Sequence, residues 1–232
     1  MATNKAKMKN AQPQKSQLEE VLKDQWLFRQ YEDEHIPVIE VDSFPELGRM
    51  VALRFIEWVQ QNPEGVVSLP AGKTPEYFIR WMHHLLDNWG APEKQTMLEQ
   101  YGLSPERPDF SRLTFVQIDE FFPLPGDHPN SFIAYIKHYY LKPFGFDLER
   151  ALLMDFDRLT WPEGLSMKDI FPDQFIDLSL RTRTPLSDAE AIQREAIFQL
   201  DAFAQEYEHK IRQLGGIGFF LGGHRTRRPH RF

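Results

Sequence analysis

The chain has 232 residues, of which 41% are hydrophobic and 26% are charged, and this ordinary globular composition excludes a disordered or fibrous body. Its net charge of -7 excludes generic binding to nucleic acid or to anionic membranes, so an anionic ligand would need a local positive site. Because cysteine is absent, disulfides, thiolate nucleophiles and cysteine-bound metals are excluded, and we expect a cytoplasmic protein. Since no apolar run is long enough to cross a bilayer, we expect no membrane-spanning segment.

The length favours one globular unit with insertions over several small domains. The polar, lysine-rich start predicts a mobile arm over residues 1–15, followed by one α/β domain over residues 16–223. Proline-bearing and polar stretches predict insertions near residues 90–112 and 154–186. Residues 224–232 are rich in arginine, unlike the rest of this acidic chain, and we interpret them as an aberrant basic tail.

Helical and β-branched patterns alternate along the first part of the chain. The apolar spacing over Leu18–Trp26 predicts a leading helix, and the run Ile36–Val41 predicts a strand. Ser43 is a typical capping residue, and apolar residues continue at helical spacing to Val59. This part therefore predicts a helix, a strand and a second helix.

The next strand and helix flank a glycine turn. Gly65–Pro70 predicts a short strand. Thr74 then predicts the N-cap of a helix and Pro75 its first residue. We expect this helix to end near Trp89.

Two more strands are predicted before the last helix. Leu113–Ile118 predicts a third strand in the body of the domain, and Asn130 or Ser131 predicts the start of a helix through Tyr140. The short run Leu152–Met154 predicts a further strand.

A capping box at Ser187–Glu190 predicts the last helix, which we expect to end near Leu214 before a strand at Ile217–Leu221. Strands that alternate with helices predict an α/β fold with a doubly wound, mostly parallel sheet. Its helices are expected on both faces, which gives three layers.

The turn after Gly65–Pro70 carries groups that suit a phosphate. The helix N-terminus offers free backbone N–H groups, Gly72 permits close approach, and Lys73 and Thr74 add an ammonium and a hydroxyl. A simple capped turn explains the same residues equally well, because capped helices far outnumber phosphate sites.

Asp119 and Glu120 follow a predicted buried strand, at the sheet edge where open α/β proteins bind ligands. A carboxylate beside a partly dry cleft can act as a general base, and the alternative is a loop carboxylate that caps a helix. In the loop that follows, His128 alone is typical of a solvated turn and Ser131 is typical of a helix cap.

Several segments, in their order along the chain, are similar to one family. They are Leu69–Pro75, Phe115–Leu124, His128–Phe132, Tyr207–Ile211 and Gly216–Gly223. Together they resemble the glucosamine-6-phosphate deaminases and their sugar-phosphate isomerase and 6-phosphogluconolactonase relatives. The resemblance extends from about residue 36 to residue 223, without the insertions.

The resemblance implies roles for the two motifs. Gly72 and Thr74 would hold the phosphate of the sugar, with Lys73 where the family usually has a second glycine. Asp119 would move a proton between carbons 2 and 1 of the open-chain sugar, with Glu120 as the second carboxylate of the catalytic pair. No metal or redox cofactor is implied. Further residues are expected to support the loops, namely His128, Ser131, Gly222 and Gly223.

The implied activity is conversion of glucosamine 6-phosphate to fructose 6-phosphate with release of ammonia, in amino-sugar metabolism. The expected partner is a small sugar phosphate, and a homo-oligomer is compatible with the resemblance. One alternative is a 6-phosphogluconolactonase-like hydrolase, which lactone opening would distinguish from ammonia release. Another is a non-catalytic sugar-phosphate-binding fragment, which a binding titration would reveal.

The chain departs from the family after Gly223. Family members continue as Ile-Gly-Pro-Asp-Gly-His-Ile-Ala, whose aspartate and histidine help to open the sugar ring, and codons for this motif read one base out of frame can give His224–Phe232. We therefore hypothesise a frameshift that truncates the chain and leaves the sheet incomplete. Little activity and an exposed apolar strand at Ile217–Leu221 are then expected. The alternatives are a basic arm that binds phosphate or nucleic acid, and a surface tail without a role.

Overall fold

The computed structural model describes residues 15–25, 28–29 and 38–223. The helices are α1 Gln17–Gln25, α2 Phe44–Gln61, α3 Glu76–Leu86, α4 Pro92–Gln100, α5 Phe132–Ile136, α6 Lys142–Phe144, α7 Met167–Ile170 and α8 Asp188–Gln213, with a π-helical turn η1 Lys137–Leu141 between α5 and α6. Short 3-10 turns are η2 Leu148–Arg150, η3 Phe156–Arg158, η4 Pro162–Gly164 and η5 Leu178–Arg181. The strands are β1 Phe28–Arg29, β2 Val38–Ile39, β3 Val66–Ser68, β4 Thr114–Val116, β5 Ala151–Leu152 and β6 Phe219–Phe220. The basic tail and nearly all of the predicted arm lie outside the described residues.

The central sheet has parallel strands in the order β5-β4-β3-β6. Val67 of β3 lies opposite Phe115 of β4 on one side and Phe219 of β6 on the other. From β3 the chain moves outward through β4 to β5, and then returns to the far side of β3. This order confirms the predicted parallel, doubly wound sheet.

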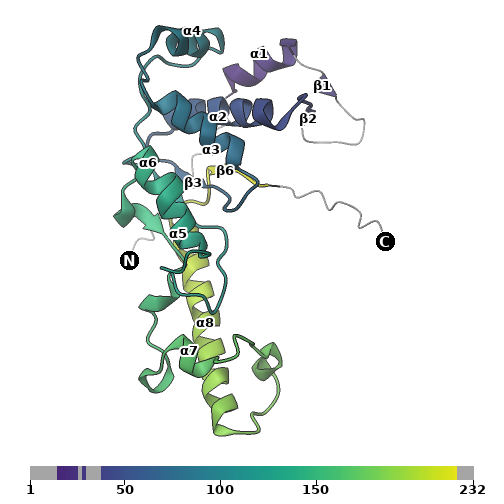
Figure 1. Ribbon diagram of the computed structural model, residues 1–232, viewed down its shortest axis with the longest axis vertical. Coiled ribbons are helices and arrows are strands. Elements are labelled where there is room, and N and C mark those ends of the chain that lie inside the picture. Colours follow the sequence, from purple (N-terminus) through teal and green to yellow (C-terminus); the bar gives the residue numbers. More distant parts are fainter. Residues whose placement is uncertain (1–14, 26–27, 30–37, 224–232) are drawn as a thin grey trace, which may run out of the picture.

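Helices cover both faces of this sheet (Figure 1). On one face, Val67 and Phe115 belong to the main core, which α2, α3, η1 and α6 complete. On the other face, Val66 and Val116 pack against Tyr207 of α8. The fold is therefore α/β with three layers, as predicted.

The strand predicted at Ile36–Val41 does not join the central sheet. Its described part, β2, pairs antiparallel with β1 as a separate two-stranded ribbon. The β-branched run correctly predicted extended backbone, but hydrogen bonding to a segment ten residues earlier decided its partner.

Serine caps are confirmed at two predicted helix starts, where the Ser43 and Ser131 side chains accept backbone N–H groups. At α8, the Ser187 hydroxyl accepts the Glu190 N–H at 3.2 Å. The predicted capping box is only half formed, because the Glu190 carboxylate accepts the Leu186 N–H. The predicted cap at Thr74 is wrong: the N-cap of α3 is Pro75, and no side chain caps it.

β6 lies at the edge of the described sheet and is covered on one face. The Phe219 ring packs on Phe55 and Trp58, with ring centroids 4.9 and 5.6 Å apart. Phe220 is 60% exposed and Ile217 is 36% exposed. The predicted exposure of this apolar strand therefore holds for Ile217 and Phe220, whereas Phe219 and Leu221 pack against the main core.

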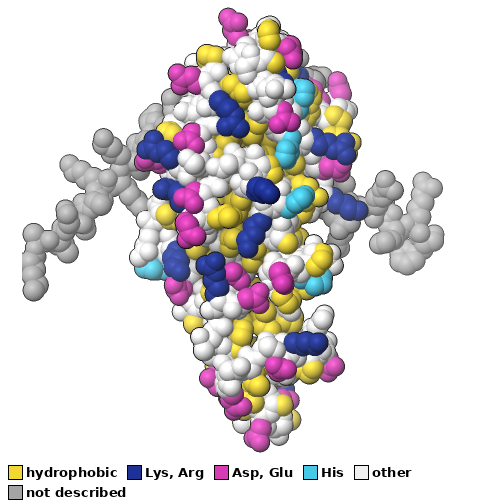
Figure 2. All heavy atoms as spheres, turned by 60° about the vertical axis from the view of Figure 1, so that its left-hand side comes forward, with side chains coloured by type: hydrophobic (Ala, Val, Ile, Leu, Met, Phe, Trp, Pro, Cys, Tyr) yellow, Lys and Arg dark blue, Asp and Glu magenta, His cyan; other side chains and the backbone are white. Residues whose placement is uncertain are grey.

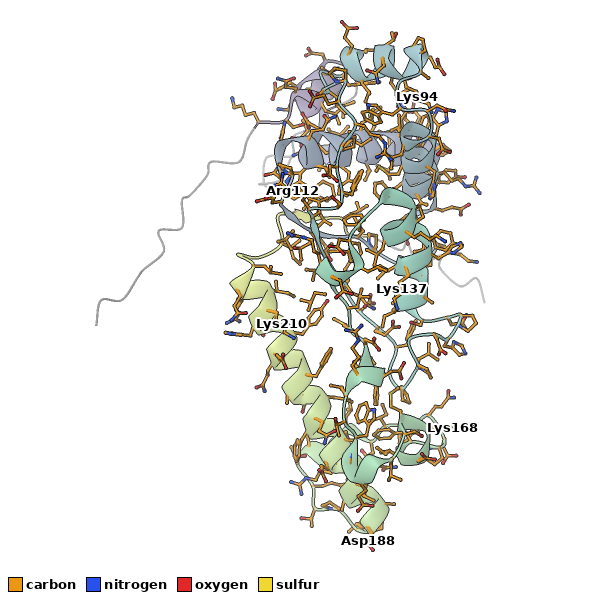
Figure 3. The ribbon with its side chains drawn as sticks, turned by 90° about the vertical axis from the view of Figure 1, so that its left-hand side faces the viewer. Lys94, Arg112, Lys137, Lys168, Asp188 and Lys210 are labelled. Atoms are coloured by element: carbon orange, nitrogen blue, oxygen red, sulfur yellow. The ribbon has the colours of Figure 1, made fainter. Side chains whose placement is uncertain are left out.

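Residues 154–203 build a second hydrophobic cluster, below the sheet in Figure 1. Its buried members are Phe156, Trp161, Met167, Ile170, Phe171, Leu180, Ala196 and Ile197. α8 connects the two parts of the molecule, since its 26 residues span roughly 39 Å. Figure 3 shows Asp188 at the far end of this helix and Lys210 near the sheet. We call the hydrophobic cluster built by residues 154–203 the second cluster.

Surface charge is mixed on the face drawn in Figure 2, where basic and acidic side chains alternate. This face therefore presents no continuous basic surface to a polyanion. None of the described helices is long and apolar enough to cross a bilayer.

Candidate functional site

The carboxyl ends of β4, β3 and β6 lie side by side, because these strands are parallel neighbours. The connections after β3 lead first to one side of it, through β4 to β5, and later to the other side, to β6, so the order of strand addition reverses at β3. In open α/β sheets, ligands bind at such a switch point, outside the carboxyl ends of the strands. The turns that follow these strands are therefore the place to look for a site.

Tyrosine hydroxyls hold the turn after β3. The Tyr140 hydroxyl donates to the Pro70 carbonyl and the Tyr135 hydroxyl donates to the Gly72 carbonyl, both at 2.6 Å. Gly72 itself has φ +91°, a left-handed conformation that disfavours any side chain. Burial raises the pKa of Tyr135 to about 12, so its hydroxyl remains a donor at neutral pH. Two tyrosine hydroxyls thus fix the backbone of this turn.

A surface hollow of about 400 Å³ adjoins this turn. Gly72, Lys73, Tyr135 and Tyr139 contribute to its lining, together with Arg80. Arg80 is paired with an acid of its own helix. Within the described part of the chain, the Lys73 ammonium has no recorded ion pair. Among the described residues, Lys73 is therefore a cation without an ion-pair partner beside the turn.

The turn after β6 touches the turn after β3. A Cβ atom placed on Gly223 would lie 2.6 Å from the Thr74 methyl carbon, closer than real Cβ atoms approach their neighbours. A side chain at residue 223 would therefore require the Thr74 side chain to move. The structure brings the predicted phosphate-binding residues and the Gly222–Gly223 turn together.

Asp119 lies in the turn after β4, and its side chain is exposed at the sheet edge. Partial burial by its surroundings raises the pKa of Asp119, and the neighbouring Glu120 carboxylate raises it further. No hydrogen bond to the Asp119 carboxylate is recorded among the described residues. An unpaired carboxylate of raised pKa suits proton transfer.

Glu120 has the opposite surroundings. Its carboxylate accepts the Phe132 and Ile133 N–H groups at 2.9 and 2.8 Å, and the Ser131 hydroxyl at 2.9 Å. These donors are the first turn of α5, where a carboxylate is stabilised by free N–H groups and the helix dipole. The alternative of a helix-capping carboxylate therefore holds for Glu120, and its catalytic role stays a prediction.

His128 and Ser131 support the loop that follows. The His128 ring nitrogen Nδ1 accepts the Asn130 N–H at 3.1 Å, so it stabilises a local turn. Ser131 is buried and caps α5, which places it beside Glu120. Neither residue has a recorded contact with Asp119.

Gln117 was not singled out from the sequence, although it holds the start of the same turn. Its side chain is 1% exposed; the amide nitrogen donates to the Asp119 carbonyl at 2.8 Å and the amide oxygen accepts the Met154 N–H at 2.8 Å. Its backbone carbonyl accepts the Tyr207 hydroxyl at 2.7 Å. A glutamine in an otherwise apolar strand was the available signal, because a buried amide needs partners.

Metal-binding groups of three or more His, Asp or Glu side chains do not occur among the residues that the structure describes. The chemistry that this arrangement can supply is cationic and backbone binding of an anion beside Gly72, and proton transfer at Asp119.

A comparison with known sequences addresses the family resemblance. The glucosamine-6-phosphate deaminase of Clostridium tetani (strain Massachusetts / E88) is 25% identical to this chain over 118 residues. Over these residues the chain is similar in sequence to a glucosamine-6-phosphate deaminase. The match covers 51% of this chain but only 42% of the Clostridium deaminase, so the chain spans less than half of the length of that relative.

A comparison with protein-family profiles finds no match. Among solved structures, a monomeric glucosamine-6-phosphate deaminase, titled as a missing link of the NagB superfamily, is 19% identical with a TM-score of 0.47. The alignment covers 76% of this chain and 50% of that deaminase. The family resemblance seen in the sequence is confirmed by the Clostridium deaminase.

Proposed function

We propose that this chain binds an amino-sugar 6-phosphate at the turn after β3 and that Asp119 transfers the proton that converts it to a ketose 6-phosphate. The reaction breaks the C2–H bond and forms a C1–H bond, after which water releases the amine as ammonia. In this proposal Gly72, Lys73 and Thr74 hold the phosphate. Glu120 orients the turn from the α5 N-terminus.

One observation carries the proposal: the strand order puts the Gly72 turn between the Asp119 turn and the Gly222–Gly223 turn. A ligand whose phosphate lies at the central turn would then have the carboxylate on one side and the glycine pair on the other. The Lys73 ammonium supplies the local positive charge that an anion needs on an acidic protein. The raised pKa of Asp119 favours a proton-transfer role.

The domain division predicted from the sequence is part of the same proposal. Residues 16–223 would form the sugar-phosphate unit, and the stretches near residues 90–112, which contain α4, and 154–186 would be insertions. The frameshift hypothesis concerns the tail, which lies outside the described residues, and it stays a prediction.

The test measures ammonia release from glucosamine 6-phosphate, lactone opening with 6-phosphogluconolactone, and binding of both by calorimetry. We expect ammonia release that falls by about 10²–10⁴-fold in Asp119→Asn, the range for loss of a general base. Asp173→Asn, an exposed acid in the second cluster, serves as the control and should match the parent chain.

Lactone opening without ammonia release would replace the deaminase with the hydrolase alternative. Binding without either reaction would leave a sugar-phosphate binder and reject the catalytic role of Asp119. No binding of glucosamine 6-phosphate would contradict the proposal as a whole.

A further inference from the structure

The turn after β4 reaches into the second cluster through one aromatic side chain. The Phe122 ring lies against Phe156, Trp161 and Phe171, with ring centroids 5.3, 5.7 and 5.6 Å apart. Phe122 follows Asp119 by three residues. Asp119, the candidate base, is therefore close in sequence to Phe122, whose ring packs against aromatic residues of the 154–203 segment.

The preceding residue points to a different element. The Phe121 ring packs on Phe132 of α5, with ring centroids 4.8 Å apart. Phe121 and Phe122 thus contact different parts of the protein, α5 and the second cluster. The turn is held between these two supports.

A polar contact ties the same loop to the second cluster. The Gly126 N–H donates to the Asp157 carboxylate at 2.9 Å, and Asp157 is the neighbour of Phe156 in η3. Phe122 and Gly126 therefore both rest on η3. A displacement of η3 would move the loop at two points.

Two further contacts hold the backbone on either side of Asp119 in the sequence. Gln117 holds the backbone before it, and Glu120 holds the backbone after it on α5. The Asp119 carboxylate has no recorded hydrogen bond of its own in the described part of the chain. Its position therefore depends on how its neighbours are held.

We propose that the second cluster is a support for the Asp119 turn and that Phe122 is the positioning residue through which it acts. The inference rests on the proposed function for its catalytic consequence. It gives the 154–203 excursion a role in the site, although this excursion lies largely beyond the sheet. Small displacements of a reacting group can lower turnover by about 10²-fold, which is why such a support matters.

The experiment compares Phe122→Ala and Phe122→Leu with Leu180→Ala. Leu180 is fully buried in the same cluster, on η5 against α8, so its truncation loosens the cluster from another side. The protein carries ¹³C-labelled aspartate carboxyl groups, and Asp119→Asn assigns the Asp119 signal. The titration of this signal is followed by NMR, together with kcat and KM for glucosamine 6-phosphate.

We expect Phe122→Ala to move the Asp119 titration toward that of an ordinary aspartate, because a freed turn would move the carboxylate away from the neighbours that partly desolvate it. Its kcat should fall by about 10²-fold with little change in KM, since the phosphate turn is untouched. Phe122→Leu should retain part of both properties, and Leu180→Ala, which keeps the Phe122 ring contacts, should change both much less than Phe122→Ala does. If Phe122→Ala does not fold, Phe122→Leu provides the same comparison.

An unchanged Asp119 titration in a folded Phe122 variant would overturn the inference. An equal change in Leu180→Ala would also overturn it, because general loosening would then explain the effect. If the parent chain releases no ammonia, the proposed function fails, whereas the NMR titration still decides whether Phe122 positions Asp119.

Discussion

The turns after β3 and β4 end neighbouring parallel strands, but different chemistry holds them. Neutral tyrosine hydroxyls from the helical segment after Ser131 hold the β3 turn, at the Pro70 and Gly72 carbonyls. A charged carboxylate, Glu120, and a buried amide, Gln117, hold the β4 turn. In both turns the anchors bind backbone or helix ends and leave the candidate functional side chains free. In each turn, the residues that hold the backbone are therefore different from Lys73 and Asp119, the side chains proposed to act on a ligand.

The largest stability effect is expected for the charged anchor. Glu120→Ala removes the acceptor of the Phe132 and Ile133 N–H groups and should lower the free energy of unfolding by about 2 kcal/mol. Urea denaturation measures the change. Glu149→Ala, at an exposed glutamate, is the control and should change stability little. Equal effects of the two variants would mean that Glu120 does not anchor α5.

The two tyrosine hydroxyls that hold the β3 turn should contribute less to the free energy of unfolding than Glu120 does. Tyr140 is fully buried, so Tyr140→Phe leaves the Pro70 carbonyl without its donor and should cost about 1–1.5 kcal/mol. Tyr135 is only partly buried, and Tyr135→Phe should cost about 0.5 kcal/mol. Thermal or urea unfolding compares the two variants. A larger effect at Tyr135 would reverse our ranking of the two hydroxyls.

Alanine substitutions at two glycines would distinguish an effect of backbone strain from an effect on ligand binding. Gly72 and Gly145 have φ +91° and +87°, and a Cβ on either would meet no atom within 4 Å. Alanine at each should therefore cost about 1 kcal/mol of stability through the left-handed conformation alone. Only Gly72→Ala should also weaken glucosamine 6-phosphate binding in calorimetry. Equal affinities of the two variants would count against a phosphate at the β3 turn.

The smallest effect concerns pH. The pKa of Asp119 is raised in the folded protein, so its proton is held to a higher pH than that of an ordinary aspartate at about 3.9. Turnover should rise with pH through this raised value, because the base must be ionised. The same shift stabilises the fold below the unfolded pKa, and this contribution is lost as pH rises through the folded pKa. A pH profile of kcat/KM with an acid limb at the ordinary aspartate value would contradict the assignment.

The sequence patterns predicted the central fold well because they are local. The short apolar strands β3, β4 and β6 and the serine-capped helices appear where their periodicity and caps indicate. Boundaries were less accurate: α3 ends at Leu86, with Asp87 as its C-cap, although we expected this helix to end near Trp89. Thr74 was expected as a cap on local chemistry, whereas Pro75 occupies that place and Thr74 contacts Gly223 from another strand.

The candidate site was likewise predicted only in part from local sequence patterns. The sequence pointed to Gly72 and Asp119 through their places after strands, but it did not separate the roles of Asp119 and Glu120. Their surroundings differ because α5 presents its N-terminus to one carboxylate and not to the other. Phe122 was also missed, since its socket is formed by residues more than thirty positions later.

Sequence patterns alone predict the α/β class, the alternation of strands and helices, and the residue types available at the sheet edge. These follow from hydrophobic period and capping chemistry, which act over a few residues. Packing between distant segments sets which side of β3 pairs with β6, which carboxylate meets the N-terminus of α5, and which residues Phe122 packs against. Those outcomes depend on contacts between distant segments, whose desolvation and hydrogen bonding no local pattern encodes.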